Sequence, residues 1–173
     1  LEYGDFAFDG LDGKGPIAVG VERKRLHDML ACIDDNRLVS HQRIGMVQLY
    51  TERWLVLEGL WRPHDPKGLL MEGQETTDAT SGKRVITWWE SRPGGRPILY
   101  SKLRRYLFSV CRSGSFLDVL YTRDIVQTAY DLCELFHYYQ KREHVSHMAK
   151  QRMVIPSLNG RPPLVRRWAE EID

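Results

Sequence analysis

The first 35 residues constrain the fold most, because their hydrophobic pattern changes from strand-like to helical within a short span. Residues 3–8 (YGDFAF) and 17–24 (IAVGVERK) are rich in residue types that favour β-strands. The GLDGKGP stretch between them is rich in turn-forming glycine. From Arg25 the apolar residues recur at helical spacing, until a polar run at residues 34–36 stops them. The sequence therefore predicts a β-hairpin with a long loop, followed directly by a short helix.

The middle of the chain continues with one further helix and one further strand before its pattern becomes irregular. Ser40 is a candidate N-cap for a helix that runs to about Tyr50, and residues 54–59 (WLVLEG) have the pattern of a buried strand. Residues 61–97 are rich in Pro, Gly and Thr, so we expect them to form an inserted, mobile segment. Within it, residues 84–89 (RVITWW) are strand-like and are expected to pair with the region of residues 69–71.

The last part of the pattern is helix, strand, helix. Apolar residues at helical spacing follow Pro97, residues 116–121 form a strand pattern, and Thr122 is the expected cap of a long helix that reaches about Arg142. The apolar residues expected on the buried side of that helix are Ile125, Val126, Ala129, Leu132, Cys133, Phe136 and Tyr139. The whole order predicts an α/β fold with a mixed central sheet flanked by helices.

Length and composition limit the class of protein. With 173 residues, of which 42% are hydrophobic, the chain is long enough for one domain with a proper core, which we place at residues 1–144. No run of about 18 apolar residues occurs, so the sequence predicts no transmembrane helix. Three widely spaced cysteines fit neither a disulfide framework nor a zinc site, which favours a reducing, intracellular setting. Residues 145–173 are expected to hold a linker and the start of a further region, since residues 155–164 are rich in Pro and Gly.

A pair of acidic residues and a lysine near the N-terminus form the candidate site. Residues two apart in a strand project to the same face, so Glu22 and Lys24 are expected on one side of the strand and Arg23 on the other. If the hairpin places Asp5 opposite or diagonal to Glu22, the two carboxylates come within a few Å of each other. A divalent cation relieves their repulsion, and hard oxygen ligands favour Mg²⁺ or Mn²⁺ over zinc. The pattern therefore predicts a metal site that can activate a water molecule for attack on a phosphate.

These residues also carry a family resemblance. Gly4-Asp5, then Glu22-Arg23-Lys24, three intervening residues and Asp28 resemble the nuclease signature of the XPF family. The ACIDDNRL stretch, a glutamine downstream of it and a strand ending in Glu58 resemble further segments of that family. The similarity is close over residues 3–60 and loose over residues 98–141, and it is greatest with compact phage or prophage members.

The resemblance implies a restriction-endonuclease-like core of the PD-(D/E)XK type and a structure-specific endonuclease that cuts branched, flap or junction DNA. In that comparison Asp5, Glu22 and the backbone carbonyl of Arg23 bind Mg²⁺ or Mn²⁺, and Lys24 positions or activates water. Arg23 and Asp28 are required partners in catalysis, and the resemblance places two further residues, Arg37 and Gln42, on the DNA side. It also implies a homodimer, a core segment that precedes Leu1, and a helix-hairpin-helix-like region beyond residue 173.

Two other classes of function remain open at this point. A catalytically silent XPF-like domain would serve as a DNA-binding or dimer-forming module, and a phage regulatory protein would use the same fold to bind a host protein. Inactive relatives typically lose the acidic or lysine positions, whereas this sequence keeps them. The histidines lack the paired spacing of metal ligands, so none is assigned as a ligand. Trp54, Trp88 and Trp89 are expected in the core rather than in base stacking.

Overall fold

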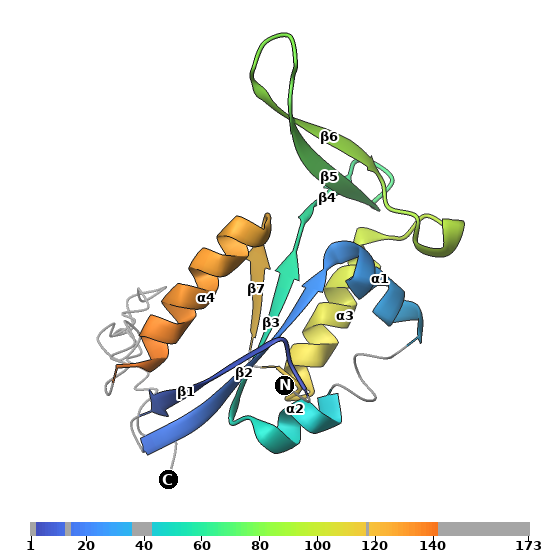
Figure 1. Cartoon of the computed structure of the whole chain (residues 1–173). Helices are drawn as coiled ribbons and strands as arrows, with labels where there is room; N and C mark the ends of the chain where they lie inside the picture. The colour runs from blue at the N-terminus through green and yellow to red at the C-terminus, as the bar shows by residue number, and fades with distance from the viewer. Residues whose placement is uncertain (1–2, 13–14, 36–42, 117, 142–173) are drawn as a thin grey trace, which may run out of the picture.

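The computed structural model describes residues 3–12, 15–35, 43–116 and 118–141, and within these it shows two sheets and four α-helices (Figure 1). In chain order the elements are β1 (Phe6–Asp12), β2 (Gly15–Arg25), α1 (Leu26–Asp35), α2 (Arg43–Leu49), β3 (Glu52–Glu58), β4 (Leu60–His64), β5 (Leu69–Thr77), β6 (Arg84–Glu90), the 3-10 helix η2 (Pro93–Gly95), α3 (Tyr100–Arg112), β7 (Asp118–Thr122) and α4 (Ile125–Tyr139). The predicted fold class, a mixed central sheet flanked by helices, is confirmed.

The central sheet has the strand order β1-β2-β3-β7. β1 pairs antiparallel with β2, whereas β2, β3 and β7 run parallel to one another. Helices α1 and α3 lie on one side of this sheet, and α4 lies on the other, as Figure 1 shows. The parallel strands are therefore covered on both faces, which explains the apolar run of residues 54–57 in β3.

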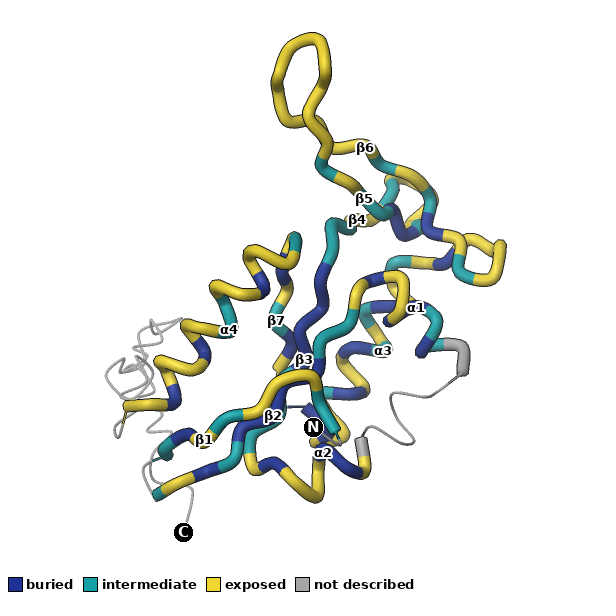
Figure 2. The backbone as a smooth tube through the Cα atoms, in the orientation of Figure 1, coloured by how far each residue is buried: buried dark blue, intermediate teal, exposed yellow. Residues whose placement is uncertain are grey.

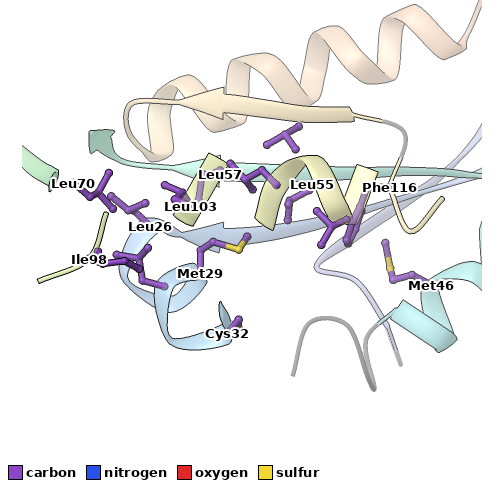
Figure 3. Close-up of a cluster of buried hydrophobic side chains, with 14 of the residues drawn as sticks. Leu26, Met29, Cys32, Met46, Leu55, Leu57, Leu70, Ile98, Leu103 and Phe116 are labelled. Atoms are coloured by element: carbon purple, nitrogen blue, oxygen red, sulfur yellow. The ribbon is translucent and has the colours of Figure 1, made fainter. Parts of the chain in front are cut away.

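Two apolar clusters fill the spaces on the two sides of the central sheet. The larger one lies between the sheet and helices α1, α2 and α3, and Figure 3 shows Met29, Leu55, Leu103 and Phe116 within it. The smaller one lies under α4 and includes Val56. Each fully buried Leu or Met side chain contributes about 1.5–3 kcal/mol to folding. β2 therefore lies between the two clusters, and Figure 2 shows buried stretches along it.

Residues 61–97 contain most of a second, three-stranded antiparallel sheet with the order β4-β5-β6. The predicted strand at residues 84–89 is present and pairs with β5, the strand that contains residues 69–71, but further along β5 than predicted. It pairs with residues 72–77, whereas residues 69–71 pair with β4. The end of the β5–β6 hairpin projects away from the central sheet and is largely exposed (Figures 1 and 2).

The β1–β2 hairpin is longer than predicted, because most of the expected loop is strand. β1 continues to Asp12 and β2 begins at Gly15, and these two residues are register partners. Gly10, which the sequence suggested as a turn residue, is buried within β1. A Cβ at Gly10 would lie 2.8 Å from the Cβ of Tyr139 in α4, so this glycine allows close helix-to-strand packing.

The prediction for α4 was wrong in its cap and in most of its buried side. Asp124, rather than Thr122, is the N-cap, and its carboxylate accepts a hydrogen bond from the backbone N–H of Gln127 at 2.9 Å. Thr122 is instead the last residue of β7. The buried residues of the helix are Thr128, Leu135 and Tyr139, and the exposed ones include Ile125, Val126, Ala129, Cys133 and Phe136. Because α4 has apolar residues on several sides, its sequence does not show which side of the helix is buried.

The predicted helix around residues 40–50 is present as α2, and Ser40 lies outside the described residues, as does Arg142. The predicted strand at residues 116–121 is β7, which begins two residues later. Among the described helices, none combines the length and apolar character needed to cross a lipid bilayer.

Candidate functional site

Glu22 and Lys24 lie together on one face of β2, as the strand alternation predicted. The Nζ atom of Lys24 is 2.5 Å from Oε1 of Glu22. The Glu22 side chain is only 2% exposed and that of Lys24 is 17% exposed. A carboxylate this far from water is costly unless a cation or hydrogen bonds compensate it. The ammonium of Lys24 supplies one such compensating charge.

Asp5, which immediately precedes β1, reaches the same part of β2. Its backbone N–H donates to the carbonyl of Val21 at 2.9 Å, and its Oδ2 atom accepts a hydrogen bond from the backbone N–H of Arg23 at 2.7 Å. The Asp5 carboxylate is therefore held at the backbone between Glu22 and Lys24. Gly4 makes this approach feasible, because its φ of 81° is in the left-handed region and a Cβ there would lie 3.0 Å from Sδ of Met46.

The side chain of Arg23 points to the opposite face, toward β3 and α4. Its Nε and Nη2 atoms donate to Oε2 and Oε1 of Glu58 at 2.9 and 2.5 Å, a bidentate arrangement. Thr128 donates its hydroxyl hydrogen to Oε2 of Glu58 at 2.8 Å. Since that hydrogen is used, Thr122 must be the donor in the 2.7 Å contact between the Thr122 and Thr128 hydroxyls. This network joins the ends of β2, β3 and β7 to α4.

Opposing effects on Glu58 leave the ion pair charged. Burial alone would raise the pKa of the Glu58 carboxyl, but the hydrogen bonds from Arg23 and Thr128 outweigh it, so the pKa lies below the ordinary value. The hydrogen bond to Glu58 raises the pKa of Arg23 against the effect of burial. Arg23 and Glu58 therefore remain ionised at neutral pH.

The network around Arg23 is the part of the site that the sequence did not predict. The strand ending in Glu58 was recognised, but no role was assigned to Glu58, and Thr128 was not singled out at all. The available signal was a glutamate at the end of an otherwise apolar strand, since a charged residue in that position usually has a partner.

The remaining predicted site residues do not join this cluster of side chains. Asp28 lies in the first turn of α1, where a negative charge interacts favourably with the helix dipole. It is exposed, and within the described part of the chain its side chain makes no hydrogen bond or salt bridge, although its charge helps to raise the pKa of Arg23. Arg37 and Gln42 lie outside the described residues.

The donor atoms at the site are those that a hard divalent cation prefers. Over the residues that the structure describes, no three His, Cys, Asp or Glu side chains gather in a way that would hold a metal. The local oxygen donors are the carboxylates of Asp5 and Glu22 and the backbone carbonyl of Arg23. Mg²⁺ commonly uses only one or two carboxylates and keeps several waters. Such a donor set fits Mg²⁺ or Mn²⁺ and lacks the thiolates and imidazoles of zinc sites.

No protein-family model matches the sequence, and no curated protein matches it. Among solved structures, the fold is similar to that of XPF from Aeropyrum pernix in complex with DNA, with a TM-score of 0.44 and 15% sequence identity. The similarity covers 79% of this chain and 56% of the Aeropyrum pernix chain. The chain thus corresponds to little more than half the length of that protein.

Proposed function

We propose that the chain is a metal-dependent nuclease that hydrolyses phosphodiester bonds in branched, flap or junction DNA inside the cell. The observation that carries this proposal is the buried carboxylate of Glu22, which is paired with Lys24 on β2, where the carboxylate of Asp5 also accepts a hydrogen bond from the backbone N–H of Arg23. A buried acid beside an amine near the carboxyl end of an interior strand costs too much free energy to be expected in a purely structural role. The XPF-type signature formed by the same residues supports this interpretation.

In the proposed mechanism Asp5, Glu22 and the carbonyl of Arg23 would hold Mg²⁺ or Mn²⁺. The bound cation would lower the pKa of a water molecule and offset charge on the phosphate oxygens. Lys24 adds a second positive charge on the same face, where it can stabilise charge that develops on phosphate. A cation bound at Glu22 would compete with Lys24 for the carboxylate, so the Glu22–Lys24 ion pair is expected to loosen when metal binds.

Arg23 and Glu58 have a supporting role in this proposal. Their ion pair fixes the end of β2 from the opposite face, and Glu22, Lys24 and the Arg23 carbonyl all belong to that strand. The pair thereby keeps the oxygen donor atoms of β2 in position. A small displacement of catalytic groups would lower the reaction rate strongly. Asp28 would add negative charge at the start of the next helix and so help to hold Arg23 protonated.

The experiment that tests the proposal is a single-turnover cleavage assay on flap, splayed-arm and duplex DNA, with Mg²⁺, with Mn²⁺ and with chelator. Asp5→Asn and Glu22→Gln keep side-chain size but remove the charge that holds the cation, so both should abolish cleavage. DNA affinity should be unchanged or higher, because repulsion of phosphate decreases. Lys24→Ala should still bind Mn²⁺ but cleave far more slowly, since the charge next to the phosphate is lost.

Two substitutions away from the site serve as matched controls. Glu134→Gln changes a glutamate that is 82% exposed on α4, and Lys67→Ala changes an exposed lysine between β4 and β5. Both should cut like the wild type. Wild-type cutting by all three site variants would refute the assigned site. A folded wild-type protein that binds branched DNA but never cuts it would favour a catalytically silent DNA-binding module, and one that binds no DNA would favour a regulatory protein that binds another protein.

A further inference from the structure

A groove of about 690 Å³ lies where the base of the β5–β6 hairpin, the start of α4 and the carboxyl ends of β2 and β3 meet. Its lining includes Arg25, Glu58, Glu72, Trp89, Arg123 and Asp124. A neighbouring hollow of about 460 Å³ shares part of this lining and extends along β5 toward Arg84. Both volumes are in the range of about 300–1,000 Å³ that ligand sites occupy. Asp5, Glu22 and Lys24 do not line the groove.

The acidic side chains of the groove are already engaged within the protein. Glu58 accepts hydrogen bonds from Arg23 and Thr128. Glu72 accepts one from the hydroxyl of Ser91, and Asp124 caps α4 and pairs with Arg123. Glu58 and Asp124 are therefore paired with arginines, whereas Glu72 is hydrogen-bonded to a neutral hydroxyl and keeps its charge.

Arg25 is the cation of the groove that remains available. It is exposed, and its side chain makes no salt bridge with any residue that the structure describes. Its charge acts at longer range, since it helps to lower the pKa of Glu58. An exposed guanidinium that makes no salt bridge within the described residues favours an anionic ligand, and its planar fork suits phosphate.

Trp89 gives the groove an aromatic surface. It is 42% exposed, so the prediction that Trp89 lies in the core was wrong. It lies on β6 opposite Glu72, with Gln74 two residues further along β5. An accessible indole next to polar side chains is the arrangement on which unpaired nucleic-acid bases stack.

We propose that this groove binds an unpaired nucleic-acid strand, with a base stacked on Trp89 and a phosphate at Arg25. The inference rests on the proposed function and adds the part of the substrate that the groove recognises. Arg25 directly follows Lys24 in β2 but projects to the other face of the strand, the face of Arg23. A strand bound in the groove would therefore reach the candidate site around the carboxyl end of β2. Bases in a duplex are stacked and paired and cannot cover an indole, so the groove distinguishes a single strand from blunt duplex.

The test is the affinity of the full chain for labelled oligothymidylate and for blunt duplex, measured by fluorescence anisotropy in chelator so that no cutting occurs. Trp89→Ala should weaken single-strand binding about 5-fold to 100-fold, the range for loss of one stacked base. Trp89→Phe should keep most of the affinity, whereas Trp89→Leu should resemble the alanine variant because it retains apolar area without an aromatic ring. Duplex affinity should change little in all three.

Arg25→Gln should act through a different quantity, the salt dependence of binding. Loss of one phosphate contact should reduce the slope of log affinity against log salt by about 0.7 for a single strand, and Trp89 variants should leave that slope unchanged. Phe108→Ala and Arg112→Gln are the matched controls, since both residues are exposed on α3 and neither lines the groove. Both controls should bind like the wild type.

Wild-type single-strand affinity in the Trp89 and Arg25 variants would overturn the proposal, as would equal losses for single strand and duplex or no single-strand binding by the wild type. Trp89→Phe guards against misfolding, because it must fold and bind if the ring acts by stacking. The outcome is separable from the proposed function. A wild type that cuts DNA while the groove variants bind normally refutes the groove alone. A wild type that never cuts while the groove variants lose affinity refutes the nuclease alone.

Discussion

Replacing Glu58 by Gln tests how the end of β2 is held. The substitution keeps the shape of the side chain but removes the negative charge of the carboxylate. That carboxylate accepts two hydrogen bonds from Arg23 and one from Thr128. A hydrogen bond to a charged group contributes about 1.5–3 kcal/mol, and a fully buried pair broken on one side costs about 3–5 kcal/mol. The Arg23 side chain is 21% exposed, so water can solvate part of the guanidinium after it loses the Glu58 carboxylate. We therefore expect a loss of about 2–3 kcal/mol, or about 5–10 °C in Tm.

The effect should depend on pH in one direction. The folded-state pKa of Glu58 lies below its ordinary value of 4.5, so the carboxylate stabilises the fold fully above that pH. As the pH falls from about 4.5 through the lower folded-state pKa, the carboxylate of the wild type becomes protonated and its advantage disappears. The difference in unfolding free energy between wild type and Glu58→Gln should therefore be largest near neutral pH and shrink in acid.

Chemical denaturation followed by circular dichroism at a series of pH values measures this difference. Glu90→Gln is the matched control, because Glu90 forms a 2.7 Å salt bridge with Arg92 whose side chains are 27% and 58% exposed. Solvent screens such a pair, so this variant should change stability little. The reasoning fails if Glu58→Gln is as mild as the control, or if its effect persists unchanged in acid.

Two further substitutions probe the smaller cluster and the packing against β2. Burial raises the pKa of Tyr139 to about 12, whereas an unfolded tyrosine titrates near 10, so the wild type should lose stability between these pH values more steeply than Tyr139→Phe. Equal slopes in pH-dependent denaturation would contradict this. Gly20→Ala should cost about 1–3 kcal/mol, since the new Cβ would clash with the ring of Tyr50, and an unchanged Tm would contradict it.

Patterns among residues close in the sequence made many of the strands and helices predictable. Alternation along a strand correctly placed Glu22 and Lys24 on one face and Arg23 on the other. Helical spacing located α1 and α3, whose buried residues include Leu103 and Leu107. These features depend on residues within a few positions of each other, so the sequence contains the information directly.

Features that depend on distant contacts were not predictable. The partner of Arg23 lies 35 residues away, and only the parallel pairing of β2 with β3 brings it close. Thr122 and Asp124 are both good capping residues, and the cap was decided by where β7 ends. The role of Gly10 could not be inferred either, because it depends on α4, which comes much later in the chain.

The strand order of the central sheet has a consequence for the order of folding during synthesis. β1, β2 and β3 emerge from the ribosome early, but the partner on the other side of β3 is β7, which follows β4–β6 and α3. Until then β3 is an exposed sheet edge that carries Leu55, Val56 and Leu57, and such edges are prone to aggregation. The β4–β6 sheet can form during this interval from local contacts, so the nascent chain is expected to pass through a stage in which this sheet precedes the completed central sheet.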